Sequence, residues 1–117
     1  MSYDISLVDS TDEVIILDEP WDGQGGTYQV GGTHEAWLNV TYNYGEILRD
    51  VLGPGGIRSL YGKRAIDTIP KLEAAIDNLG DDVSGDYWEA TEGNVKRALM
   101  DLVRLAKLAP HGVWKGD

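Results

Sequence analysis

Carboxylates are the residues of this sequence with the clearest capacity for chemistry, and they gather in two runs that contain no base. Residues 1–48 hold nine acidic residues without a lysine or arginine, and residues 81–95 hold five more. Across the 117 residues, 20 acids outnumber 10 bases, which gives a net charge of −10. The acids that we expect to contact a partner are Asp9, Asp12, Glu13, Asp18, Glu19, Asp22, Asp81, Asp82, Asp86, Glu89 and Glu92.

Calcium binding is one chemistry that the second run suggests, because it spans twelve positions from Asp81 to Glu92. A calcium loop of that length needs an oxygen ligand at its third position and a glycine at its sixth. Val83 and Asp86 stand there instead, so we expect no metal site. Paired carboxylates would also suit a small hydrolase, but sequence alone does not set the distance between two of them. We therefore expect no catalysis and keep a hydrolase as a minor alternative.

Phosphate binding is also not expected. In the glycine-rich stretch 23–28, Tyr28 stands where a dinucleotide-binding turn has its last glycine, and no Gly-Lys-Ser/Thr run opens a helix. The negative charge opposes direct binding to nucleic acid. Without cysteine there are no disulfides and no thiolate sites, and neither His34 nor His111 has metal-ligand spacing to a neighbour. We expect no cofactor.

The aromatic residues suggest a second kind of contact surface. All are Tyr (6) or Trp (4), and each of these rings carries a polar group suited to a half-buried position or an interface. Trp37 and Trp88 are the candidates for partner binding, although rings of this kind also cap small cores. Trp21 and Trp114 must either fold back on the core or await a partner.

The N-terminal part, residues 1–43, reads as strands. Residues 3–8 alternate apolar and polar, residues 14–17 are rich in β-branched side chains, and 9–12 have turn chemistry, so we predict a β-hairpin. Residues 18–34 contain too many glycines for a long element, although 27–30 has a short strand pattern. Alternation over 36–42 predicts a third strand.

The C-terminal part, residues 44–117, reads as helices. A short helix is predicted from Tyr44 to the glycines at 53–56, and a single turn over 57–62. A second helix is predicted with Thr68 as its cap, Pro70 in its first turn and Gly80 after its end. The last helix follows Thr91 and ends before Pro110. We predict one α+β domain over 1–117, with an antiparallel sheet of two or three strands packed against three helices.

The expected location is the cytoplasm. No apolar run approaches the roughly 18 residues that a membrane-spanning helix needs, and the first residues lack the pattern of a signal peptide. We expect no contact with a membrane.

Three runs of the sequence carry a resemblance. They are GTHEAWLNVTYNY at 32–44, GIRSLYGK at 56–63 and the stretch beginning DDVSGDYWEATEGNVKRAL within 81–117. Over nearly its whole length the chain resembles small acidic proteins of bacterial phages and mobile elements. The resemblance implies a setting in which short acidic proteins antagonise host defence, as anti-CRISPR or anti-restriction inhibitors. It carries no functional residue over to this chain.

Two functions follow as expectations. The first is a protein-binding inhibitor whose carboxylates stand in for DNA phosphates on a basic DNA-binding effector, with electrostatic steering of the encounter. The alternative is a non-catalytic interaction or regulatory protein of a mobile element that binds through Tyr and Trp, residue types common at binding hot spots. An acidic surface that only keeps the protein in solution would leave the first of these without a basis.

Overall fold

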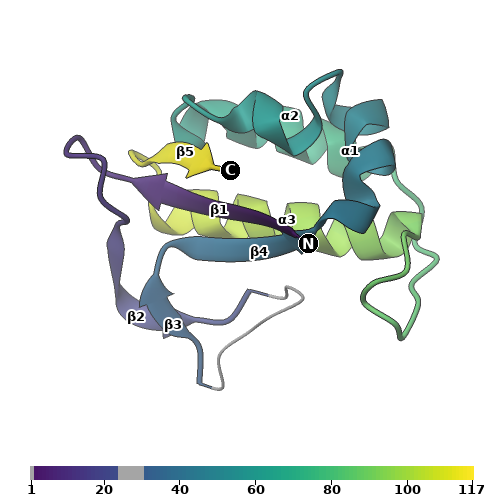
Figure 1. Cartoon of the computed structure of the whole chain (residues 1–117), viewed down its shortest axis with the longest axis horizontal. Coiled ribbons are helices and arrows are strands. Elements are labelled where there is room, and N and C mark those ends of the chain that lie inside the picture. Colours follow the sequence, from purple (N-terminus) through teal and green to yellow (C-terminus); the bar gives the residue numbers. More distant parts are fainter. Residues whose placement is uncertain (1, 24–30) are drawn as a thin grey trace.

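The structure is a computed structural model that describes residues 2–23 and 31–117, and it confirms the α+β class (Figure 1). The strands are β1 (Ser2–Val8), β2 (Ile16–Trp21), β3 (Thr33–Glu35), β4 (Trp37–Thr41) and β5 (Val113–Gly116). The helices are α1 (Gly45–Leu52), α2 (Ala65–Asp77) and α3 (Glu92–Leu108), with short 3-10 turns η1 (Tyr42–Tyr44) and η2 (Gly56–Leu60). The short strand suggested at 27–30 lies outside the described residues.

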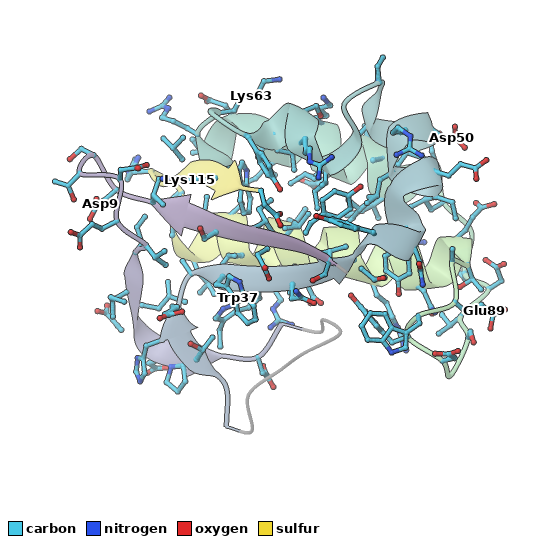
Figure 2. All side chains as sticks on the ribbon, viewed as in Figure 1. Asp9, Trp37, Asp50, Lys63, Glu89 and Lys115 are labelled. Carbon is cyan, nitrogen blue, oxygen red and sulfur yellow. The ribbon has the colours of Figure 1, made fainter. Side chains whose placement is uncertain are left out.

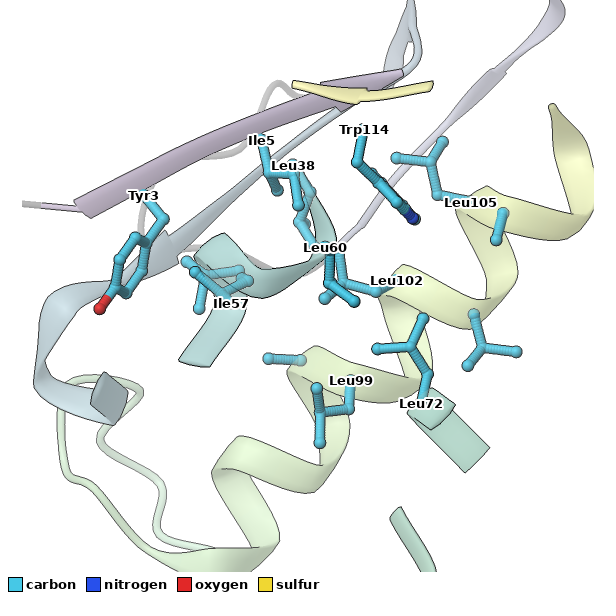
Figure 3. Close-up of a cluster of buried hydrophobic side chains, with 14 of the residues drawn as sticks. Tyr3, Ile5, Leu38, Ile57, Leu60, Leu72, Leu99, Leu102, Leu105 and Trp114 are labelled. Atoms are coloured by element: carbon cyan, nitrogen blue, oxygen red, sulfur yellow. The ribbon is translucent and has the colours of Figure 1, made fainter. Parts of the chain in front are cut away.

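The main sheet has the order β4-β1-β5, and both pairings are antiparallel. Alternation in β1 places Tyr3, Ile5 and Leu7 on one buried face. In register, Ile5 lies opposite Leu38 and Leu7 lies opposite Trp114, so the three strands present one apolar surface. Figure 3 shows Ile5, Leu38 and Trp114 between the sheet and the leucines of α3. The alternating pattern therefore specifies the face that binds the helices.

The predicted hairpin of residues 3–17 forms only at its turn, and the pairing of its two strands beyond the turn was predicted wrongly. Asp9 N–H donates to the Glu13 carbonyl at 2.8 Å, and a single bridge joins Val8 to Val14. After that point β2 leaves the main sheet and pairs with β3 instead. β1 has no free edge for β2, because β4 and β5 lie on its two sides. Residues 18–34 therefore contain part of a second, two-stranded sheet where we expected mostly loop.

The predicted start of α2 is also wrong. The helix begins at Ala65, which places Thr68 and Pro70 inside it. The amides of the first turn are satisfied by other parts of the backbone, since Ala65 N–H donates to Gly112 O at 2.8 Å and Ile66 N–H donates to Pro110 O at 3.1 Å. No side-chain cap is needed where carbonyls of a distant turn accept these bonds.

The structure adds β5, a strand that we did not predict. It pairs with β1 on one side, while Gly62 N–H donates to Trp114 O and Trp114 N–H donates to Lys63 O on the other, both at 2.9 Å. The outer edge of β5 is therefore covered. Trp114 and Trp21 both fold back on the core, with exposed fractions of 1 % and 5 %.

The first and last helices match their predictions. α1 ends at Leu52, before Gly53, whose φ of 96° is one that L side chains rarely adopt. In α3, the Thr91 hydroxyl accepts from Asn94 N–H at 3.1 Å and caps the helix. The helix then buries its apolar stripe against the sheet, as residue spacing predicted.

Candidate functional site

Six of the nine acids of the first run lie on the turn at 9–13, on β2 and directly after it, and Figure 1 shows this turn and strand at one end of the molecule. We call this surface the acidic end; it comprises Asp9, Asp12, Glu13, Asp18, Glu19 and Asp22, all exposed. Its tip is a tight turn in which Asp12 has a φ of 66°, a conformation that Asp tolerates better than most residues. Asp9 Oδ1 accepts from the Thr11 hydroxyl at 2.6 Å and from two backbone amides. These bonds, with that from Thr11 first, lower the pKa of Asp9. The tip is therefore built around an ionised carboxylate.

The rest of the acidic end is positioned by β2. Leu17 and Trp21 of this strand are buried, and the residues between them are exposed. Trp21 Nε1–H donates to Glu35 O at 3.1 Å, which ties β2 to β3. Burial of these two apolar residues therefore holds Asp18 and Glu19 in solvent.

Bases from later in the chain reach parts of the acidic end. Lys115 pairs with Asp12, and Arg104 pairs with Asp22 at 3.7 Å. The Arg104 guanidinium also lies 3.5 Å from Asp101 and over the Trp21 ring at 5.4 Å. Exposed pairs of this kind contribute little to stability, about 0–1 kcal/mol each. They lower the local negative charge at two of the six acidic positions.

The second run, residues 81–92, forms a loop before α3 that we call the acidic loop. Its five carboxylates all accept hydrogen bonds within the domain. The donors are Lys96 Nζ to Asp81 (2.7 Å), Gly93 N to Asp82 (3.3 Å), Trp88 N to Asp86 (3.0 Å), Ser84 Oγ to Glu89 (2.7 Å) and Gly80 N to Glu92 (3.0 Å). These acids therefore have a structural role in shaping the loop and the start of α3.

The two acidic surfaces lie apart. Figure 2 shows Asp9 and Glu89 at opposite ends of the longest axis, along which the domain extends 37 Å. The turn of the first run and the acidic loop therefore do not share one face. A single partner patch of modest size would contact one end or the other.

Asn94 organises the acidic loop, and sequence analysis did not identify it. Its side chain is 5 % exposed; Oδ1 accepts from Ser84 N–H at 3.1 Å, and Nδ2 donates to Asp86 O and Glu89 O, both at 3.0 Å. An asparagine at the third position of an amphipathic helix has no distinctive sequence signal. The burial arises only when the loop folds over it.

The two candidate tryptophans lie near opposite ends of β4, Trp37 on the strand itself and Trp88 in the acidic loop. Trp37 is partly buried at the start of the strand. Trp88 is 46 % exposed and is held at the other end, where Asn43 Nδ2 donates to its carbonyl at 2.9 Å and the Tyr87 ring lies 5.1 Å from its own. Four residues of strand correspond to about 13 Å, so the rings do not form one aromatic patch.

Two tyrosines with raised pKa values are expected to make the domain sensitive to alkali. Tyr44 is fully buried and donates its hydroxyl to Tyr87 O, and burial raises its pKa well above 10. Burial, and secondarily the charge of Asp117, raises the pKa of Tyr61 to about 12. A tyrosine whose pKa is raised on folding stabilises fully below its unfolded pKa of about 10 and loses that contribution as pH rises through the folded value.

We therefore expect the urea midpoint to be flat from pH 8 to 9 and to fall from pH 10 to 12. Tyr61→Phe should reduce the fall. It should cost little at pH 8, because the Tyr61 hydroxyl is buried without a hydrogen-bond partner among the described residues. An unchanged midpoint from pH 9 to 12 in the native chain would contradict this assignment.

The described residues include neither a cluster of metal-binding side chains nor a membrane-spanning helix. Within 2–23 and 31–117, no three His, Asp or Glu side chains are grouped so that they could hold a metal ion. In the same ranges, no helix has the length and apolar character needed to span a bilayer. Comparisons with protein-family models, curated proteins and solved structures gave no match. The surface itself is therefore the basis for a functional assignment.

Proposed function

We propose that the protein inhibits a DNA-binding effector of a host defence system by occupying its basic surface with the acidic end. The observation that carries the proposal is the exposure of six carboxylates on the turn at 9–13, on β2 and directly after β2. This turn and this strand lie on the same side of the molecule (Figure 1). Among the described residues, ion pairs at the acidic end involve two of the six acids, Asp12 and Asp22. Most of the negative charge of the acidic end therefore remains for a partner.

Charge complementarity supports this class of partner. A duplex carries one negative charge per about 1.7 Å of its axis, so its binding sites are lined with Lys and Arg. A protein with a net charge of −10 is steered toward such a surface and repelled by the nucleic acid itself. The acidic loop takes a lesser part, because all five of its carboxylates accept hydrogen bonds within the domain. At the acidic end such bonds and ion pairs engage Asp9, Asp12 and Asp22, and the charges of Glu13, Asp18 and Glu19 are the ones that we assign to the partner.

The proposal is tested by capture with the full chain from a bacterial lysate that contains CRISPR and restriction effectors. We expect a DNA-binding effector that elutes as salt is raised and is displaced by duplex DNA. The triple variant Glu13→Gln, Asp18→Asn, Glu19→Gln should weaken capture at least tenfold at low salt, because each charged contact at an interface contributes to the encounter.

A matched control removes the same charge elsewhere. Glu46→Gln, Asp50→Asn, Glu73→Gln changes three exposed acids on α1 and α2 and should reduce capture far less. Equal losses in the two triple variants would mean that only the overall charge matters. Capture that resists both salt and DNA would contradict phosphate mimicry.

The exposure of Trp88 favours a second candidate function, a non-catalytic interaction protein that binds through this ring. Under this alternative, Trp88→Ala abolishes capture, whereas the acidic-end triple variant binds normally. Trp37→Ala serves as the control, because that ring is partly buried on β4.

A further inference from the structure

An apolar groove lies beside the acidic end. It has a volume of about 200 Å³ and lies between β2 and the end of α3, with the following turn. Ile16 and Leu108 border it with exposed fractions of 66 % and 54 %, and these are the most exposed large apolar side chains among the described residues. The rest of its lining is Ile15, Leu17, Asp18, Ala109, Pro110, His111 and Gly112, so Asp18 is its one acidic residue.

The fold accounts for this exposure. Ile15 and Leu17 alternate with Ile16, so the side chain of Ile16 turns outward where its neighbours turn toward the core. Leu108 is the last residue of α3, beyond the stripe that packs on the sheet. Two large aliphatic side chains are thus held facing solvent on rigid elements. Exposed apolar groups arranged in this way mark interaction sites more often than isolated ones do.

The groove and the acidic end form one surface. Asp18 lines the groove itself, and β2 also carries Glu19. Figure 1 shows β2, the turn at 9–12 and the C-terminal end of α3 on the same side of the molecule. An apolar centre with an acidic rim follows the usual plan of protein interfaces, in which apolar anchors are surrounded by polar groups.

The size of the groove indicates what it holds. Pockets for small ligands and cofactors usually measure about 300–1,000 Å³, and this groove is smaller. A cavity of about 150 Å³ is large enough for benzene, so one leucine or aromatic side chain fits here. A larger groove of about 640 Å³ lies between α2 and α3, but four acids and three bases line it together, so it offers no comparable charge preference.

We propose that the partner contacts the acidic end with a basic segment that carries one large apolar side chain, and that this side chain inserts between Ile16 and Leu108. This inference rests on the proposed function and specifies the chemistry of its partner. A second copy of the chain is the less favourable occupant, because it would bring two acidic ends together.

The test uses two synthetic heptapeptides titrated into the isotopically labelled full chain, followed by NMR. Both peptides have six lysines, and the central residue is leucine in one and alanine in the other. We expect the leucine peptide to bind at least fivefold more tightly and to shift the amides of 14–18 and 108–112. Leu108→Ser should remove the difference, whereas Met100→Ser, which changes another exposed residue of α3, should preserve it.

The acidic-end triple variant separates this inference from the proposed function. Equal binding of both peptides to the native chain, reduced by the triple variant, would overturn the groove and leave the proposed function standing. A leucine preference that survives Leu108→Ser, or shifts outside the groove, would also overturn it. Dimerisation of the native chain that Leu108→Ser abolishes would assign the groove to a second copy and contradict the inference.

Discussion

Trp114→Ala is expected to lower the free energy of unfolding by about 3–5 kcal/mol, the usual cost of truncating a buried tryptophan. The ring is 1 % exposed and lies between the sheet and the helices, as Figure 3 shows. Its indole N–H donates to the Thr68 hydroxyl at 2.8 Å, and that hydroxyl donates to Ala65 O at 2.7 Å. Urea denaturation followed by circular dichroism measures the loss.

Two further variants divide this loss into packing and hydrogen bonding. Thr68→Val keeps the volume but leaves the buried indole N–H without its acceptor, which should cost about 1–3 kcal/mol. Trp114→Phe retains much of the apolar contact and should fall between Thr68→Val and Trp114→Ala. A Trp114→Ala chain with native stability would show that β5 does not belong to the cooperative core.

Asn94→Ala should destabilise the domain by about 2–3 kcal/mol, because three hydrogen bonds worth about 0.5–1.5 kcal/mol each are lost together. The effect should concentrate in the acidic loop. In hydrogen exchange, the Ser84 amide should lose protection first, since Asn94 Oδ1 accepts from it. Amides in the centre of α3 should lose protection only to the extent that the whole domain is destabilised.

Asn94→Asp sharpens this prediction. The aspartate still accepts from Ser84 but turns an oxygen toward the carbonyls of Asp86 and Glu89, where the amide donated. It should therefore be at least as destabilising as Asn94→Ala. Lowering the pH to protonate the new carboxyl should restore part of the stability. If Asn94→Asp were as stable as the native chain at neutral pH, the two donated bonds would have no importance for the loop.

Local patterns were sufficient to predict several elements. α3 has a capping threonine and a continuous apolar stripe, and β1 and β4 have period-two alternation, so each carries its signal within its own residues. Their structures follow the predictions closely. The single turn that we predict over 57–62 corresponds to η2 at Gly56–Leu60.

Elements that depend on distant residues were missed. β5 has only four residues, and its strand character comes from pairing with β1 and from the cover provided by 62–65. Thr68 resembled a helix cap in the sequence, but its hydroxyl is the acceptor for Trp114. The true start of α2 depends on carbonyls of the 110–112 turn, which no local pattern reveals.

The candidate site, too, has features that local sequence predicted and features that depend on the folded structure. Sequence identified the acids and their two runs, but it did not show that the runs lie at opposite ends or that the acidic loop is internally bonded. Nor did it indicate the groove, because the exposure of Ile16 and Leu108 depends on which faces of β2 and α3 pack inward.

The position of β1 between β4 and β5 also affects how the chain can assemble. Leu7 pairs with Trp114, so closing the sheet joins segments from nearly opposite ends of the sequence and carries a large loop-closure cost. During synthesis, the apolar face of β1 and one of its edges remain unpaired until residues 113–116 are available. An exposed strand edge of that kind is a template for aggregation, so a chaperone would benefit this domain most before residues 113–116 pair with β1.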